Sequence, residues 1–256
     1  MVFKTNNLKF YYEKYGNKKK SIIILPGWGN TRNTFNTIID ALKEEYTIYI
    51  LDYPGFGNSP IPEQNLTIFD YAKAIQEWIL ENGIHNPHMI AHSFGGRIVS
   101  LLIGKYNVKI DKLLLIDVAG IKRRKKIKII LKEILYKLLK RLTYLLPPIK
   151  QEEIRQKLLF YFSSTDYQTI SNKMRYTFQN IIKINLKKYY KKIKNDTLII
   201  WGEKDVDTPL KDAYILKRII KNSELIIYPN STHYSYLYNQ PLTINICKEL
   251  FQKKSK

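Results

Sequence analysis

The sequence lacks features that would place it in several other classes of protein. It has one cysteine, Cys247, so no internal disulfide can form, and we expect this thiol to be a core side chain rather than a nucleophile. No apolar run reaches the roughly 18 residues that a membrane-spanning helix needs. Residues 1–20 carry six lysines and no apolar stretch typical of a signal peptide, which predicts a cytoplasmic location.

Metal-binding and cofactor-binding motifs are also missing from the sequence. Its histidines, cysteine and acidic residues nowhere have the spacing typical of a metal site. Its glycines match neither a phosphate-binding loop nor a dinucleotide-binding fingerprint. We therefore expect no metal and no cofactor. With 256 residues and no internal repeat, the chain is expected to form one large domain, or one domain with an insertion.

Acidic residues are scarce in one part of the chain. Residues 121–195 hold 21 lysines and arginines but only four acidic residues, a net charge of +17 out of +21 for the whole chain. A general bias toward lysine would explain the basic residues but not the missing acids. The alternative is a surface for an anionic partner: an anionic membrane, a coenzyme-linked or phosphorylated acid, or an acidic carrier protein. Nucleic acid is not expected, because the aromatic residues do not interleave with the basic ones.

One serine stands between an apolar segment and a helical pattern. The apolar residues 87–90 lead into Ala-His-Ser-Phe-Gly-Gly at positions 91–96. A sharp turn from strand to helix needs small residues two before and two after its apex, because the two backbones nearly touch, and Ala91 and Gly95 are small. Such a turn lifts the Ser93 hydroxyl to where a base can reach it. A serine that merely caps a helix is the alternative.

Four other apolar segments each end in a polar loop that bears glycine or proline. They are residues 22–25, 46–51, 197–201 and 224–228, followed by PGWGN, DYPGFGNS, GEKDVDTP and PNSTH. Short, mostly apolar runs are typical of strands buried on both faces of a parallel sheet, and their loops open on one edge, where ligands bind. The sequence therefore predicts an α/β fold with a ligand site at that edge.

With these segments the chain resembles the α/β-hydrolase family over nearly its whole length. The order Ser, Asp, His along the chain is that of the family. The resemblance implies a mostly parallel central sheet with helices on both faces. It also implies that Ser93 is the nucleophile, Asp205 the acid and His233 the base.

The resemblance further implies that the backbone N–H groups of Trp28 and Phe94 form the oxyanion hole. The chain departs from the family at Pro26, where histidine is usual, and at Ala91, where glycine is usual. Neither position supplies a reacting group, so the expected chemistry is unchanged.

Two neighbouring residues offer alternatives for the acid and the base. Asp207 lies in the same loop as Asp205, but the family spacing Trp-Gly-x-x-Asp-x-x-x-Pro selects Asp205 and leaves Asp207 as a loop cap. His92 is adjacent to Ser93, but its side chain should point away from the apex of such a turn.

Between residues 119 and 195 the alternation of strands and helices stops. Apolar residues at helical spacing run from 127 to 146, and Pro147-Pro148 is expected to end that helix. In the α/β-hydrolase family this position, after the sixth strand, carries a helical cap over the active site. The resemblance thus implies a core formed by residues 1–118 and 196–256, with residues 119–195 as an inserted helical cap.

The residue types predict a serine hydrolase that cleaves a carboxylic ester through an acyl-enzyme. Within the family, PGWG and DxPGFGxS are most similar to small esterases of the biotin pathway, which cleave a methyl ester on an acyl carrier protein. The expected substrate is a small-molecule ester, anionic or carrier-linked. The alternatives are a carbon–carbon hydrolase or lyase with the same triad, and a membrane-peripheral lipid esterase based on the basic amphipathic residues 122–146. A binding protein without catalytic activity is a further alternative, which the presence of Ser93, Asp205 and His233 disfavours.

Overall fold

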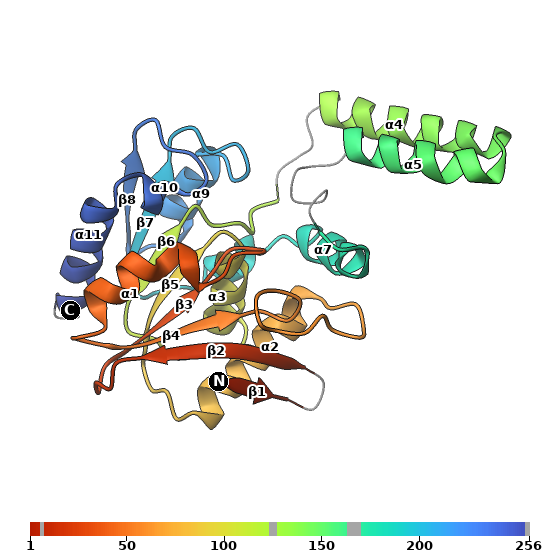
Figure 1. The fold of residues 1–256 in the computed structure, drawn as a ribbon. Coiled ribbons are helices and arrows are strands. Elements are labelled where there is room, and N and C mark those ends of the chain that lie inside the picture. Colours follow the sequence, from red (N-terminus) through yellow and green to blue (C-terminus); the bar gives the residue numbers. More distant parts are fainter. Residues whose placement is uncertain (6–7, 123–126, 163–169, 254–256) are drawn as a thin grey trace.

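The computed structural model describes residues 1–5, 8–122, 127–162 and 170–253, and an eight-stranded sheet forms its centre (Figure 1). The sheet order is β1-β2-β4-β3-β5-β6-β7-β8. The strands are β1 (Val2–Lys4), β2 (Lys9–Tyr15), β3 (Ser21–Leu25), β4 (Thr47–Asp52), β5 (His88–His92), β6 (Leu113–Ile116), β7 (Thr197–Gly202) and β8 (Ser223–Tyr228). Strands β3 to β8 run parallel, whereas β1 and β2 are antiparallel additions at one edge. The predicted mostly parallel sheet is confirmed.

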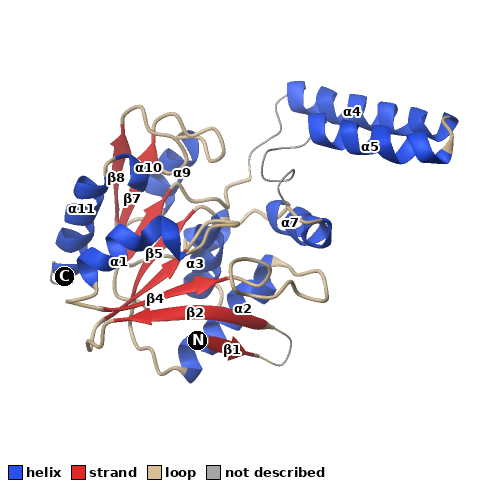
Figure 2. Ribbon diagram, viewed as in Figure 1, coloured by secondary structure: helices blue, strands red, loops and turns tan. Residues whose placement is uncertain are grey.

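Helices cover both faces of the sheet (Figure 2). Alternate residues of each central strand enter two separate cores, as in β3, where Ile23 packs on one face and Ile24 on the other. On the Ile24 face lie α1 (Asn36–Leu42) and α11 (Gln240–Gln252), with Cys247 buried there as expected. The Ile23 face carries α2 (Ile68–Glu81), α3 (Phe94–Gly104) and α9 (Lys211–Ile219). A short helix, α10 (Ser235–Tyr238), follows the last strand.

A 3-10 turn, η1 (Arg32–Phe35), precedes α1. One expected helix end differs from the structure. The helix expected to end at Pro147-Pro148 already ends at Leu142, and Pro148 begins the next helix. The fixed φ of proline suits the first position of a helix as well as the end of one, so the pattern alone could not tell the two apart.

All the secondary structure that the described residues between 119 and 195 form is helical, and none of them joins the sheet. Their elements are α4 (Ile127–Leu142), η2 (Thr143–Leu145), α5 (Pro148–Phe162), η3 (Asn172–Met174), α7 (Arg175–Ile182) and α8 (Lys187–Tyr190). Figure 1 shows α4 and α5 as a hairpin that projects away from the sheet, whereas α7 lies nearer to it. The basic residues at 123–126 lie outside the described residues. Among the helices that are described, none is both long and apolar enough to cross a membrane.

Candidate active site

Ser93 occupies a tight turn between β5 and α3. Its backbone has φ 47° and ψ −110°, a conformation that non-glycine residues rarely adopt. Two residues later, a Cβ added to Gly95 would lie 2.0 Å from the Leu25 carbonyl oxygen of the neighbouring strand β3. The small residue that the sequence indicated is therefore required by the close approach of α3 to the sheet.

The structure brings Ser93, His233 and Asp205 together in a continuous chain of hydrogen bonds. The Ser93 Oγ lies 2.8 Å from His233 Nε2, and His233 Nδ1 lies 2.8 Å from Asp205 Oδ2. These residues are far apart in the sequence and come from loops after β5, β8 and β7. The carboxyl ends of parallel strands meet at one edge of the sheet, which explains how they converge.

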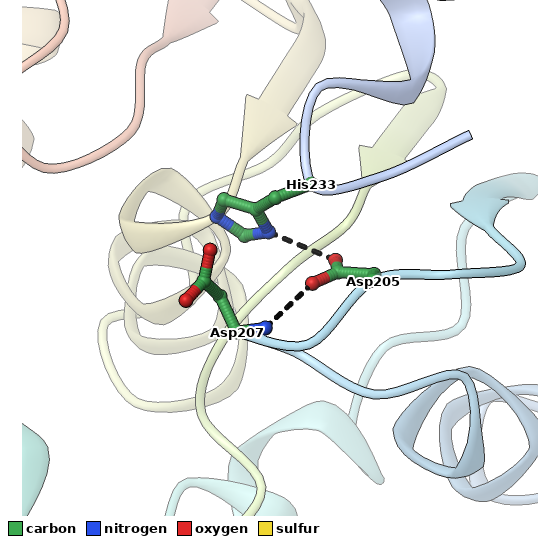
Figure 3. A group of neighbouring side chains, drawn as sticks. All are labelled: Asp205, Asp207 and His233. Atoms are coloured by element: carbon green, nitrogen blue, oxygen red, sulfur yellow. Dashed lines mark hydrogen bonds and ion pairs between the residues drawn. The ribbon is translucent and has the colours of Figure 1, made fainter. Parts of the chain in front are cut away.

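The Asp205 carboxylate is buried and held by its own loop. Its Oδ1 accepts hydrogen bonds from the backbone N–H groups of Asp207 and Thr208, both at 2.9 Å, and its Oδ2 accepts one from the Thr208 hydroxyl at 2.6 Å. Figure 3 shows this carboxylate between the His233 ring and the Asp207 N–H. Asp207 itself is exposed and contributes a backbone donor. Asp205, the aspartate that the family spacing selects, is therefore the one that contacts His233.

The surroundings of His233 favour the protonated imidazole. Burial alone lowers the pKa of His233, but the hydrogen bond and negative charge of Asp205 together outweigh it, so the pKa is raised above its ordinary value. This carboxylate also makes Nδ1 the protonated nitrogen, because a carboxylate oxygen can only accept. In the neutral ring Nε2 is then the acceptor that faces the Ser93 hydroxyl.

Asp117 is a buried carboxylate that the sequence reading did not assign to the site. It directly follows β6, with φ 46°, and its oxygens accept from the N–H groups of Gly202 at 2.7 Å and Ser235 at 3.0 Å, and from the Ser235 hydroxyl at 2.5 Å. Burial raises the pKa of Asp117 to about 7, against these hydrogen bonds. Gly202 precedes the Asp205 loop and Ser235 follows His233, so Asp117 links the two loops. Its position after a buried strand was a signal that could have found it.

His92 points away from the apex of the turn, as expected, but it contacts the loop that carries His233. Its Nε2 donates to the His233 carbonyl oxygen at 2.8 Å, and its Nδ1 lies 3.4 Å from Asn30 Nδ2. Burial lowers the pKa of His92 to about 3, so the ring is neutral. A neutral imidazole has one N–H group, and in His92 it donates to the His233 carbonyl oxygen. His92 therefore positions the backbone of His233.

Trp28 and Phe94 lie side by side near Ser93. Trp28 follows β3, Phe94 is the first residue of α3, and their ring centroids are 5.1 Å apart. A first-turn N–H such as that of Phe94 has no partner within its helix. The Trp28 ring also packs against Phe56 at 4.6 Å and Phe178 of α7 at 5.2 Å. Helix α7 therefore contacts Trp28, one of the two residues that the resemblance gives to the oxyanion hole.

One group of potential metal ligands among the described residues coincides with this site. Ligand atoms of Asp205, Asp207 and His233 lie within 4.8 Å of one another (Figure 3). The facing nitrogen, His233 Nδ1, must carry a proton to donate to Asp205, and Asp205 already accepts from Thr208 and from two backbone N–H groups. Hydrogen bonds thus already engage the ligand atoms of Asp205 and His233, which disfavours a metal ion between them.

Two related proteins, an esterase and a lipase by name, align with most of this chain. It is 25% identical, over an alignment of 264 positions including gaps, to the pimeloyl-[acyl-carrier protein] methyl ester esterase of Wigglesworthia glossinidia brevipalpis, covering 95% of this chain and 98% of that protein. It is 26% identical to Lipase 3 of Moraxella sp. (strain TA144), covering 83% of this chain and 71% of that protein.

The fold matches solved structures over its whole length. MGS-M2, an α/β-hydrolase enzyme from a Medee basin deep-sea metagenome library, superposes with a TM-score of 0.76 at 18% identity, covering 100% of this chain and 98% of that one. The family model for the alpha/beta hydrolase fold matches residues 20–151, which is more than half of the chain. The chain therefore belongs to the α/β-hydrolase fold family of enzymes.

Proposed function

We propose that the protein hydrolyses a carboxylic ester, with Ser93 as nucleophile, His233 as general base and Asp205 as the acid that orients it. The observation that carries this proposal is the unbroken chain of 2.8 Å hydrogen bonds from Ser93 Oγ through His233 to Asp205. A serine hydroxyl is a weak nucleophile until an adjacent base takes its proton, and this arrangement provides such a base.

The first half of the reaction forms an acyl-enzyme. Ser93 Oγ bonds to the ester carbonyl carbon while its proton passes to His233 Nε2, and Asp205 stabilises the imidazolium. The carbonyl oxygen becomes an oxyanion and accepts hydrogen bonds from the N–H groups of Trp28 and Phe94. Collapse of this intermediate breaks the bond to the alcohol, which leaves with the proton from Nε2.

The second half of the reaction returns the enzyme to its starting state. His233 takes a proton from water, whose oxygen bonds to the acyl carbon, and the Ser93–acyl bond then breaks. The proton on Nε2 returns to Ser93 Oγ. The products are a carboxylic acid and an alcohol, and no cofactor is consumed.

Apolar side chains beside the site favour an apolar acyl group. Met174 and Phe178, from η3 and α7, form a small buried cluster with Ile170, and Trp28 and Phe56 pack against it. Because Trp28 also touches Phe94, this cluster borders the proposed oxyanion hole. The contact supports our proposal that residues 119–195 form a cap that lines the acyl site.

The charge of the proposed cap favours an anionic ester. Residues 121–195 carry a net charge of +17, and the relative from Wigglesworthia is named for an ester on an acyl carrier protein. We therefore propose an anionic or carrier-linked ester as the substrate class. Cleavage of a carbon–carbon bond by the same three residues is the second candidate. A binding protein without activity would have no need for the aligned hydrogen bonds of Ser93, His233 and Asp205.

An ester panel tests the function and its substrate class together. We expect turnover of nitrophenyl esters with an optimum at short to medium acyl length, and a lower KM for an ester with a free carboxylate than for its neutral methyl ester. Raising salt should remove that difference in KM, because exposed charges attract over only about 10 Å at 0.1 M salt and over shorter distances at higher salt. Turnover of vinylogous diketone substrates without turnover of any ester would instead support the carbon–carbon hydrolase.

A further inference from the structure

Helix α4 exposes a row of large apolar side chains. We call them the apolar stripe; they are exposed by 47% to 75% and comprise Ile127, Leu131, Ile134, Leu135, Leu138 and Leu142. Isolated exposed apolar residues are ordinary on a protein surface, but a continuous row of them along a whole helix marks an interaction surface.

The apolar stripe lies on one side of α4. With about 100° of rotation per residue, its six positions fall within an arc of about 100°. The side of α4 that carries Tyr136 and Leu139 is half-buried instead, and the Tyr136 ring packs 5.6 Å from Phe162 of α5. Helix α4 thus uses one apolar side to pack on α5 and leaves the stripe uncovered in the hairpin.

Basic side chains flank the apolar stripe on both sides. Lys137 and Arg141 are exposed along one flank and Lys132 along the other. Helix α4 holds five basic residues against the single acid Glu133. Exposed aromatic residues extend this surface at the end of α5, where Lys132 Nζ lies 5.8 Å from the centre of the Tyr161 ring.

We propose that the apolar stripe docks the protein on an anionic phospholipid surface, with α4 lying in the plane of the interface. A helix of this length spans about 24 Å, and such helices bury their apolar side at the headgroup boundary while lysines and arginines meet lipid phosphates. A second copy of the chain is disfavoured as the partner, because stripe-to-stripe packing would bring two basic flanks together.

The proposed docking surface is separate from the catalytic residues. No residue of the apolar stripe belongs to the Ser93 hydrogen-bonded chain, and the elements that pack appreciably on α4 in the described structure are α5 and η2. The docking proposal therefore does not depend on the proposed ester chemistry. Membrane binding and hydrolysis of a soluble ester can be measured apart.

Vesicle flotation of the full-length protein tests the proposal. The wild type should float with vesicles containing phosphatidylglycerol and remain unbound with pure phosphatidylcholine, and added salt should weaken the binding. The Leu135→Glu/Leu138→Glu variant should bind anionic vesicles about tenfold more weakly or worse. The matched control is Leu80→Glu/Leu242→Glu, which places the same two charges at exposed leucines of α2 and α11 and should bind like the wild type.

Three results would overturn the proposal. The first is a wild type that binds neither kind of vesicle, or both equally well. The second is equal loss of binding in the stripe variant and the control. The third is a concentration-dependent dimer that the stripe variant alone abolishes, without vesicle binding by the wild type, because a second copy would then cover the stripe. Melting temperature and soluble-ester turnover, unchanged in both variants, show that the fold and the site are intact.

Discussion

The sheet body and the α4–α5 hairpin use the same residue types in opposite ways. Ile22 and Ile24 of β3 are fully buried, whereas Leu131 and Ile134 of α4 are more than half exposed. Residues 121–195, which contain the hairpin, carry a net charge of +17, of which +5 lies in the hairpin itself (residues 127–162), whereas all other residues together carry +4. Our two proposals together give a division of labour, in which the sheet body aligns the reacting groups and the projecting hairpin meets the partner.

This division has a consequence for how substitutions should act. In the sheet body, the site residues are held by hydrogen bonds of 2.8 Å and the backbones of neighbouring elements nearly touch. Even a small change of side chain there should therefore abolish turnover or destabilise the fold. In the apolar stripe, side chains already face water, so even charged replacements should leave stability and chemistry unchanged. Each prediction below tests one side of this contrast.

The largest effect is expected at Asp205. Asp205→Asn should lower kcat about 10⁴-fold, because an amide no longer holds His233 in the tautomer that accepts the Ser93 proton. Asp207→Asn should change kcat by only a few-fold, since its backbone N–H remains. Steady-state kinetics on one soluble ester measures both. The reverse ranking would assign the acid to Asp207, and loss of vesicle binding by Asp205→Asn would refute the division of labour.

The next largest effect is expected on stability. Gly95→Ala should destabilise the fold by about 3 kcal/mol or more, because the added methyl group would overlap the Leu25 carbonyl oxygen. Neither α3 nor β3 can move away freely, since both are packed in the sheet body. Leu138→Glu, a far larger chemical change, should stay within about 0.5 kcal/mol of the wild type. Urea unfolding compares the two. Equal losses of stability would mean that the hairpin packs as tightly as the body.

A smaller effect is expected at Asp117. Asp117→Asn replaces an oxygen that accepts from Ser235 by a donor, and the loop carrying His233 should shift, which lowers kcat by about ten- to a hundredfold. The KM for a soluble ester should change little, and Asp117→Glu should not restore the rate because the buried space is fixed. A kcat unchanged in Asp117→Asn would show that the contact is not needed for positioning.

The smallest effect is expected in the pH profile. His233 acts as a base only when neutral, so kcat/KM should fall about tenfold per pH unit below its pKa. That pKa is raised, so the midpoint of the acid limb should lie above the ordinary value of about 6.5. Vesicle binding should show no break at this midpoint. An acid limb centred below 6.5 would contradict the dominance of Asp205 over burial.

The fold could be predicted, and Ser93 could be singled out as a candidate, because the signals for both are local. Apolar runs ending in glycine-bearing loops and small residues around Ser93 reflect the demands of one strand and one turn, and the mostly parallel sheet is confirmed. The position of Asp117 after a buried strand is a local signal, but the contacts of Asp117 and His92 with the His233 loop depend on how distant strands are ordered. The end of α4 differs from the expectation because proline begins helices as well as following them.

The central claim is that Ser93 is the activated nucleophile of this body. A fluorophosphonate probe followed by peptide mapping tests it most directly. We expect one adduct per chain, on Ser93, and none in Ser93→Ala, which should keep the wild-type melting temperature and vesicle binding while losing ester turnover. An adduct on another residue, or near-normal turnover by Ser93→Ala, would contradict the account.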